Sequence, residues 1–278
     1  MITMENVCKS YRVAKRNAGF GAACKALFHR EYEVIEALKD ISFTIGNGEM
    51  VGYIGPNGAG KSSTIKILSG ILTPDRGKVS IDGRNLWNLD KNGRNRNSRG
   101  ERYRRIDHVR QIGVVFGQRS QLWWDVPVID SYELLRDIYS IPAKVYQNNL
   151  EELTESLALT ELLRTPARQL SLGQRMRCEI AASLLHSPGI LFLDEPTIGL
   201  DAVSKLAVRD FVRKLNREHG TTVILTTHDM QDIEALASRI ILIGKGRILM
   251  DGTLEDIRRG DASMDETLAQ LYKSYEIT

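Results

Sequence analysis

A glycine-rich stretch between an apolar run and a helical segment constrains the fold of this chain more than any other feature. It fits the pattern G-x-x-x-x-G-K-S, and its nine residues are Gly55, Pro56, Asn57, Gly58, Ala59, Gly60, Lys61, Ser62 and Ser63. Residues 50–54 before it predict a buried strand, and residues 61–69 after it predict a helix that stops at Gly70. In this order, backbone N–H groups and a helix N-terminus converge on one point, and glycine lets an anion approach them closely. The stretch therefore predicts a phosphate-binding loop, or P-loop.

Three side chains of the predicted loop carry the chemistry of binding. Lys61 should reach the β- and γ-phosphates, Ser62 should ligate Mg²⁺, and Ser63 should touch the α-phosphate. The predicted ligand is therefore a nucleoside triphosphate with its magnesium ion.

A second apolar strand is predicted to deliver two carboxylates. Residues 190–193 read as a strand, and Asp194 and Glu195 stand at its carboxyl end, where open α/β sheets bind ligands. Asp194 should hold Mg²⁺, through water or through Ser62, and Glu195 should act as the general base that polarises an attacking water. An acidic turn after a core strand is common in isolation, but beside a P-loop the pair favours catalysis.

Strands alternate with helices over most of the chain. This alternation predicts an α/β fold with a mainly parallel sheet, and the N-terminal strands predict an antiparallel β part. Residues 118–170 read as helical instead, with a helix capped by Asp130 and a second helix over 146–159. The apolar face predicted for the first of these consists of Leu134, Leu135 and Ile138. A helical subdomain is thus expected to interrupt the core.

Composition excludes some classes of protein. The 278 residues are 42% hydrophobic, no apolar run approaches the ~20 residues that span a bilayer, and Met1 begins no charged-then-apolar leader. We therefore expect a chain that is neither secreted nor integral to a membrane. Cys8, Cys24 and Cys178 lack zinc or redox spacing, and we assign them no function.

The net charge of +3 hides two basic stretches. Residues 12–30 hold five basic residues and no acid, and residues 84–110 hold nine basic residues against three acids. Such stretches suit phosphates, either of anionic lipid headgroups or of nucleic acid, and equally suit solvated surface insertions. Residues 14–30 fit either a small amphipathic helix at a membrane surface or a mobile insertion.

A short motif after the helical stretch completes a recognisable order of parts. The motif consists of Ser171, Leu172, Gly173 and Gln174. With the P-loop before it and Asp194 and Glu195 after it, the chain resembles the ATP-binding cassette (ABC) ATPases over nearly its whole length. The resemblance implies an ABC ATPase fold, a P-loop NTPase core with an inserted helical subdomain, and it implies that ATP is bound and hydrolysed with Mg²⁺.

The resemblance also implies roles for residues outside these motifs. Gln118 matches a glutamine that senses Mg²⁺ and the attacking water, and His228 matches a histidine that contacts the γ-phosphate. Tyr11 matches the aromatic residue that stacks on adenine, although the insertion after it leaves Phe28 and Tyr32 as alternatives. A loop that crosses to a partner subunit, the D-loop, is matched by Gly199, Leu200 and Asp201.

The resemblance implies that the chain works as half of a pair. In the family, the serine and second glycine of the motif, here Ser171 and Gly173, present a hydroxyl, a backbone N–H and a helix dipole to ATP on the other subunit's P-loop. Leu172 departs from the commoner glycine, but its neighbours leave the anion site intact. The second ATPase subunit is either an identical copy or a sister chain.

Further partners follow from the same resemblance. One cassette without a spanning segment implies separate transmembrane permease subunits, with the chain peripheral at the cytoplasmic face of the cell membrane. Trp123 and Trp124 stand where the family docks its membrane partner, and packing within the subdomain is the alternative. The sequences around these motifs are most similar to bacterial exporters with a small permease. A soluble ABC ATPase acting on nucleic acid or ribosomes is the weaker alternative, because relatives of that kind carry two cassettes or long coiled-coil arms.

These expectations divide the chain into two parts. An ABC ATPase domain should cover residues 1–252, with its core at 1–117 and 171–252 and the helical subdomain at about 118–170. Basic insertions should lie at about 12–33 and 84–110, and a short helical extension at 253–278.

Overall fold

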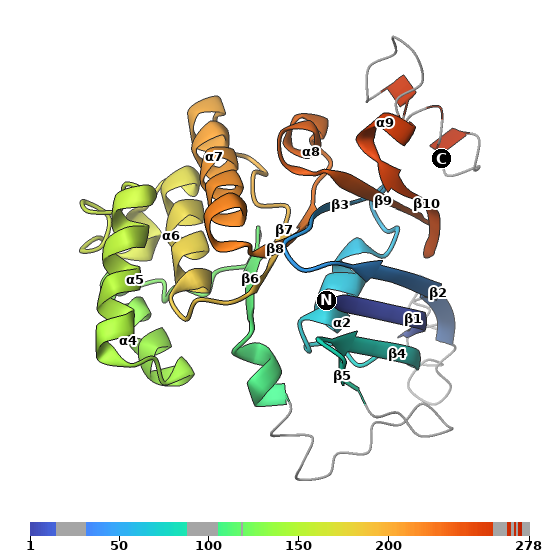
Figure 1. The fold of residues 1–278 in the computed structure, drawn as a ribbon, viewed down its shortest axis with the longest axis horizontal. Helices are drawn as coiled ribbons and strands as arrows, with labels where there is room; N and C mark the ends of the chain where they lie inside the picture. The colour runs from blue at the N-terminus through green and yellow to red at the C-terminus, as the bar shows by residue number, and fades with distance from the viewer. Residues whose placement is uncertain are drawn as a thin grey trace, which may run out of the picture.

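Two β-sheets form the framework of the protein (Figure 1). The computed structural model describes residues 1–14, 32–87, 105–117, 119–257, 266–267, 270 and 272–273. The antiparallel sheet has the order β2-β1-β4-β5, with β1 (Ile2–Ala14), β2 (Tyr32–Ile45), β4 (Arg76–Ile81) and β5 (Arg84–Asn85). The other has the order β10-β9-β3-β8-β7-β6, with β3 (Met50–Ile54), β6 (Ile112–Phe116), β7 (Ile190–Asp194), β8 (Thr222–Thr226), β9 (Arg239–Gly244) and β10 (Arg247–Thr253). Only β10 among these six runs antiparallel, so the predicted α/β fold with a mainly parallel sheet is confirmed.

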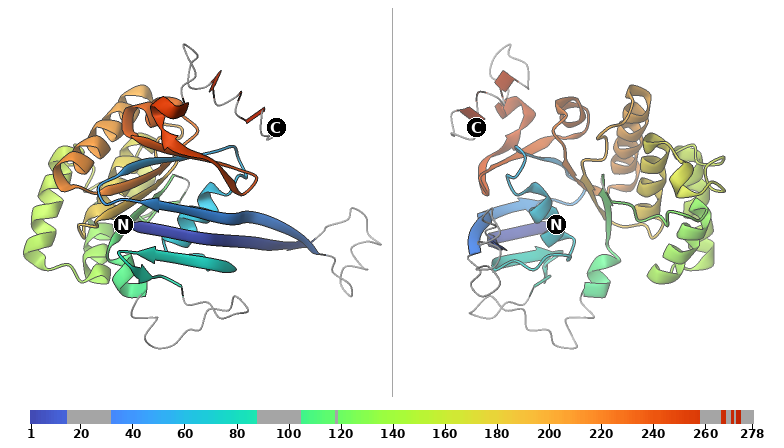
Figure 2. Two further views of the ribbon diagram at one scale, coloured as in Figure 1. Left: turned by 45° about the vertical axis from the view of Figure 1, so that its right-hand side comes forward. Right: turned by 180° about the vertical axis from the view of Figure 1, so that it is seen from behind.

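Helices cover both faces of the parallel sheet. Among the described residues, the α-helices are α2 (Lys61–Leu68), α4 (Val128–Tyr139), α5 (Ala143–Ser156), α6 (Leu172–Leu184), α7 (Ala202–His219), α8 (Met230–Leu236) and α9 (Leu254–Ile257), and Ala167–Gln169 forms a 3-10 turn. Helix α2 lies between the two sheets, and α4 and α5 lie beyond α6, farthest from the antiparallel sheet (Figures 1 and 2). In the parts of the chain that are described, no helix combines the length and apolar character needed to cross a bilayer.

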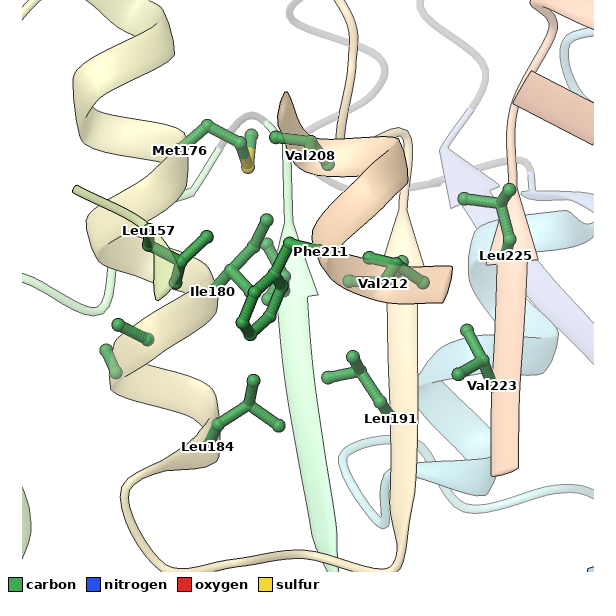
Figure 3. Close-up of a cluster of buried hydrophobic side chains, with 14 of the residues drawn as sticks. Leu157, Met176, Ile180, Leu184, Leu191, Val208, Phe211, Val212, Val223 and Leu225 are labelled. Carbon is green, nitrogen blue, oxygen red and sulfur yellow. The ribbon is translucent and has the colours of Figure 1, made fainter. Parts of the chain in front are cut away.

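Alternation along the central strands builds two apolar cores. Ile190, Phe192 and Ile224 face α2 and the antiparallel sheet, whereas Leu191 and Val223 face α6 and α7. The predicted stripe on α6 is buried against this second face, where Met176 lies beside Val208 and Ile180 beside Phe211 of α7 (Figure 3). This stripe is made by Met176, Ile180 and Leu184. The two cores hold the carboxyl ends of the parallel strands in place.

The start of α4 differs from the expectation. Asp130 is not the N-cap, because α4 begins at Val128 after Pro127. The N–H groups of Val128 and Ile129 donate to the carbonyl oxygens of Thr165 and Leu163, at 3.1 and 2.9 Å, so tertiary partners replace the cap.

The buried face of α4 is also rotated from the prediction. Val128 and Tyr132 are buried, Leu135 packs against the same core, and Ile138 is exposed. The helix α5 begins three residues before the predicted Tyr146, directly after Pro142.

The first basic insertion is described only at its ends. Strand β1 continues to Ala14 and β2 begins at Tyr32, and the two pair as a long antiparallel hairpin (Figure 2). The helix considered for residues 14–30 lies outside the described residues, apart from Ala14, which is strand. The middle of the second insertion and Cys24 also lie outside them, whereas Cys8 and Cys178 are buried free thiols.

Candidate active site

A cavity of about 810 Å³ opens where the parallel strands end. It is lined by the loop after β3, the carboxyl ends of β6 and β7, and the segment after β8. Its lining is formed by Gly55, Pro56, Asn57, Ser62, Lys66, Phe116, Gly117, Arg119, Asp194, Glu195, Ile198, Thr227, His228, Met230 and Tyr272. Residues distant in sequence thus meet at the carboxyl edge of the sheet, as the motifs predict.

The loop between β3 and α2 needs its glycines. Gly58 and Gly60 have φ values of +81° and +113°, which L side chains rarely adopt. A Cβ on Gly60 would lie 2.6 Å from the carbonyl oxygen of Ala37. Gly60 is the N-cap of α2 and provides no side-chain acceptor, and the first turn of α2 has no acid. The first N–H groups of α2 are therefore suited to an anion.

Lys61 is held inside this loop. The residue is only 7% exposed, and its Nζ donates to the carbonyl oxygens of Gly55 at 2.5 Å and Pro56 at 3.1 Å. Burial lowers the pKa of Lys61, and the nearby carboxylates of Glu195 and Asp194 oppose this by favouring the ammonium form. Lys61 thus provides a buried cationic donor inside the loop.

Asp194 and Glu195 leave β7 with different surroundings. Asp194 Oδ1 accepts a hydrogen bond from Thr226 Oγ1 at 2.5 Å and lies 3.5 Å from Ser62 Oγ. Glu195 has φ +54°, a left-handed conformation uncommon for a side-chain-bearing residue, and its N–H donates to the carbonyl oxygen of Thr226 at 2.9 Å. His228 Nδ1 lies 3.6 Å from Glu195 Oε2. The predicted carboxylates and histidine therefore share one site with the P-loop.

Thr226 is a part of the site that sequence reasoning missed. It is fully buried at the end of β8 and lies beside Asp194, because β7 and β8 pair in that register. A threonine closing an apolar strand is a weak signal, and its value here depends on strand order.

Two expectations concern residues near the loop. The hydroxyl of Tyr11 lies 3.1 Å from Ser63 Oγ, so Tyr11 stands beside α2, and the hairpin continues past it to Ala14. Tyr32 pairs with Ala14, three residues farther along the hairpin, and Phe28 lies outside the described residues. Gln118 also lies outside them, although both of its neighbours line the cavity.

The motif at the start of α6 lies apart from the cavity. Ser171 caps α6, and Gln174 completes a reciprocal capping box with it, at 3.2 and 2.9 Å. Leu172 and Gly173 form the first turn of α6, so Gly173 lies within the helix and not before it. None of these four residues lines the cavity.

The predicted D-loop leads into α7 beside this motif. Asp201 caps α7 through the N–H of Ser204 at 2.9 Å, and its hydrogen bonds with Ser204 lower its pKa. Leu200 is buried, and Gly199 has φ +71°.

Glu179 is a second residue that sequence reasoning missed. It lies on α6, only 3% exposed, and accepts hydrogen bonds from Ser120 Oγ and from the N–H of Gln121 at 3.0 Å. Burial raises its pKa, against the opposing effect of these hydrogen bonds. A carboxylate among the apolar residues of α6 was the available signal. Glu179 ties the segment after Gln118 to the helix that begins at Ser171.

The fold and the site together define a P-loop nucleoside triphosphatase. The family model described as ABC transporter matches residues 38–198. Because that match covers more than half of the chain, the chain belongs to the ABC transporter family, and it is an ATP-binding and ATP-hydrolysing subunit of that family.

Several known proteins are similar to this chain. It is 28% identical to the ATP-binding protein NatA of Bacillus subtilis (strain 168), over 87% of this chain and 92% of NatA. It is 33% identical to the daunorubicin resistance ATP-binding protein DrrA3 of Streptomyces coeruleorubidus, over 82% of this chain and 67% of DrrA3. It is 31% identical to the methionine import protein MetN of Latilactobacillus sakei subsp. sakei (strain 23K), over 83% of this chain, and spans only 64% of MetN.

The fold matches solved ATP-binding cassettes. A dimeric, post-hydrolysis structure of the cassette MJ0796 bound to ADP and Pi aligns with a TM-score of 0.72 at 29% identity, over 91% of this chain and 99% of that one. An ATP-binding subunit of an ABC transporter aligns with a TM-score of 0.75 at 25% identity, over 97% of this chain and 98% of the other.

Proposed function

We propose that the chain is the ATPase subunit of an exporter, and that it pairs with a second ATPase subunit and with separate transmembrane subunits at the cytoplasmic face of the membrane. The observation that carries the pairing is the separation of the Ser171 motif from the P-loop cavity of its own chain. A capped helix N-terminus with no ligand partner in its own chain suits an anion presented by another subunit. The dimeric MJ0796 cassette supports this arrangement.

We propose the following roles within one cavity. The N–H groups at the start of α2 and the ammonium of Lys61 bind the β- and γ-phosphates, Ser63 touches the α-phosphate, and Tyr11 stacks on adenine. Ser62 and Asp194 would hold Mg²⁺, with Gln118 as a further ligand, and the ion would neutralise charge on the phosphate oxygens.

The proposed chemistry is an in-line displacement. Glu195 takes a proton from water as its oxygen attacks the γ-phosphorus, the bond to the bridging oxygen breaks, and ADP leaves with that electron pair. His228 would contact the γ-phosphate and, at 3.6 Å, keep the Glu195 carboxylate directed toward it. The left-handed backbone of Glu195 fixes the direction in which its side chain leaves the sheet.

The proposed contacts to the partner's ATP use a hydroxyl proton and a backbone N–H that can donate to a phosphate. The hydroxyl of Ser171 accepts from the N–H of Gln174, so its own proton remains available to a phosphate oxygen. Gly173 adds a backbone N–H at the positive end of the α6 dipole. Gly199, Leu200 and Asp201 would reach the same partner from the start of α7.

A dimerisation assay tests this proposal. Glu195→Gln should abolish turnover but leave ATP binding intact, so that MgATP converts the monomer into a dimer on size-exclusion chromatography. Ser171→Arg should block that dimer and hydrolysis, while the P-loop still binds a fluorescent ATP analogue. A Glu195→Gln chain that hydrolyses ATP at the native rate would remove Glu195 from the role of base.

The exposed tryptophans support the membrane partner. Trp123 and Trp124 are 58% and 52% exposed, which favours docking over packing within the helical region. The guanidinium of Arg175 lies 5.8 Å from the centroid of the Trp124 ring, so α6 supports one side of this surface. The direction of transport rests on the resemblance to exporters, since both a resistance protein and an importer are among the relatives.

We propose that the basic stretches contact anionic lipid headgroups, with nucleic acid as the weaker alternative. Arg105 belongs to the second basic stretch. It donates to the carbonyl oxygen of Gly70 at 2.7 Å, and its guanidinium lies 5.2 Å from the centroid of the Trp87 ring. That arginine is engaged within the protein. Deleting residues 15–30 should weaken flotation with anionic vesicles, and salt-sensitive binding of nucleic acid with unchanged flotation would favour the alternative.

We also propose the division of the chain given by its motifs. The ATPase domain would span 1–252, with the helical subdomain at about 118–170, and residues 253–278 would form an extension. Helices α4 and α5 both fall within the proposed subdomain.

A further inference from the structure

Helices α6 and α7 begin side by side. The backbone at the start of α6 is packed directly against side chains at the start of α7. A Cβ on Gly173 would lie 2.3 Å from Ser204 Oγ and 2.8 Å from Ser204 Cβ. A Cβ on Gly199 would lie 2.9 Å from Cδ2 of Leu172. The first turn of α6 and the turn before α7 are therefore in direct contact at two points.

Both partners of this contact are locally fixed. The capping box of Ser171 and Gln174 sets the start of α6, and the hydrogen bonds of Ser204 to Asp201, at 2.9 and 2.7 Å, set the start of α7. Leu172 is half-buried and packs against the main core. Its side chain therefore fills the space over Gly199, and a glycine at 172 would leave that space open.

We propose that Leu172 is a positioning residue that couples the Ser171 motif to the D-loop of the same subunit. The coupling fixes the spacing of two segments that reach the partner's ATP from one subunit. It rests on the proposed function, in which Ser171 and Asp201 both act in trans. The side chain of Leu172 thus has a role that the anion site itself does not require.

A double-mutant cycle tests the coupling. Leu172→Ala keeps a helix-forming residue but removes the atoms over Gly199, and it should lower kcat about fivefold, with the KM for ATP within about twofold because the P-loop is unchanged. Gly199→Ala should lower kcat more in the native background than beside Leu172→Ala, where its new Cβ finds space. The strain of alanine at φ +71° is common to both backgrounds and cancels in the cycle.

Two controls separate positioning from packing. Leu170→Ala, at a half-buried leucine of the same core, should lower the thermal midpoint without the same loss of kcat. Leu172→Met, which restores a long side chain over Gly199, should recover most of the rate.

The outcomes distinguish this inference from the proposed function. If Gly199→Ala costs the same factor in both backgrounds, or if Leu172→Ala turns over at the native rate, the coupling is wrong. If Ser171→Arg blocks hydrolysis in the same assay, the trans role survives that failure. If Ser171→Arg hydrolyses ATP at the native rate, the trans role falls and the coupling falls with it.

Discussion

The hydroxyl of Thr226, at the end of β8, connects that strand to Asp194 at the end of β7. It donates to Asp194 Oδ1 at 2.5 Å from a fully buried position. Thr226→Val keeps the shape of the side chain and removes this donor. The N–H of Glu195 keeps its bond to the carbonyl oxygen of Thr226 at 2.9 Å, so the variant loses the bond to Asp194 and a longer, 3.2 Å contact from that N–H to the hydroxyl.

The size of the effect follows from the charge of the acceptor. A hydrogen bond to a charged group contributes about 1.5–3 kcal/mol, so the thermal midpoint should fall by roughly 3–10 °C. Among the described residues, the side chain of Asp194 then keeps the 3.5 Å approach of Ser62 Oγ. Groups that orient metal ligands typically change metal affinity or activity by about 10–100-fold, so kcat at limiting Mg²⁺ should fall within that range.

Thr222 provides a matched control on the same strand. It is also buried, and its hydroxyl accepts from the N–H of Gly48 at 2.9 Å, at the opposite end of β8. Thr222→Val should also lower stability, by less because its hydrogen bond joins neutral groups, and should leave the Mg²⁺ dependence of ATP hydrolysis unchanged. Steady-state hydrolysis over a Mg²⁺ titration, with thermal melts in EDTA, measures both effects.

Comparing the variants at Thr226 and Thr222 tests whether the Thr226 hydroxyl orients Asp194. Thr226→Ser should restore the Mg²⁺ dependence, because it restores the donor. A Thr226→Val variant with native Mg²⁺ dependence, or a Thr222→Val variant that loses as much activity, would refute the role of this hydroxyl in orienting Asp194.

Three further predictions address the loop, the buried histidines and the docking surface. Gly60→Ala should weaken binding of a fluorescent ATP analogue about tenfold or more, because its Cβ meets the carbonyl oxygen of Ala37 at 2.6 Å; Gly83→Ala, at φ +73° with nothing within 4 Å, should bind normally. Burial lowers the pKa of His108 and His186, so below about pH 6.5 the unfolded chain takes up protons that the folded chain does not. The free energy of unfolding should therefore fall as the pH drops below about 6.5, by at most about 1.4 kcal/mol per histidine at pH 5.5. Equal denaturant midpoints at pH 7.5 and 5.5 would contradict this. Trp124→Ala should reduce the membrane protein recovered with the tagged chain, and undiminished recovery would argue against docking there.

Features that are contiguous in the sequence could be predicted. The P-loop and the strand before Asp194 each place their functional groups within a few residues of one regular element, so local patterns suffice. Thr226 could not be found in this way, because its value depends on β7 pairing with β8 so that Asp194 lies beside Thr226. Hydrophobic periodicity does not specify the order of strands in a sheet.

The helical region shows the same limit. The cap predicted at Asp130 failed because the first N–H groups of α4 are satisfied by carbonyl oxygens of residues more than thirty positions away, Thr165 and Leu163. Glu179 is predictable as an unusual carboxylate on α6, but its acceptance of the N–H of Gln121 depends on how two segments pack. Tertiary partners therefore decided the details that propensity alone could not.

The fold of a single chain requires a particular residue type at some positions of the Ser171 motif and allows several types at others. Gly173 is required within its own chain, since any Cβ would collide with Ser204, so a glycine there needs no partner subunit to explain it. Ser171 is different, because capping alone would accept threonine, asparagine or aspartate at the start of α6. An aspartate would preserve the cap and add a negative charge to the face that we propose meets a phosphate. The proposed phosphate therefore disfavours an aspartate at 171, which the stability of α6 alone would accept.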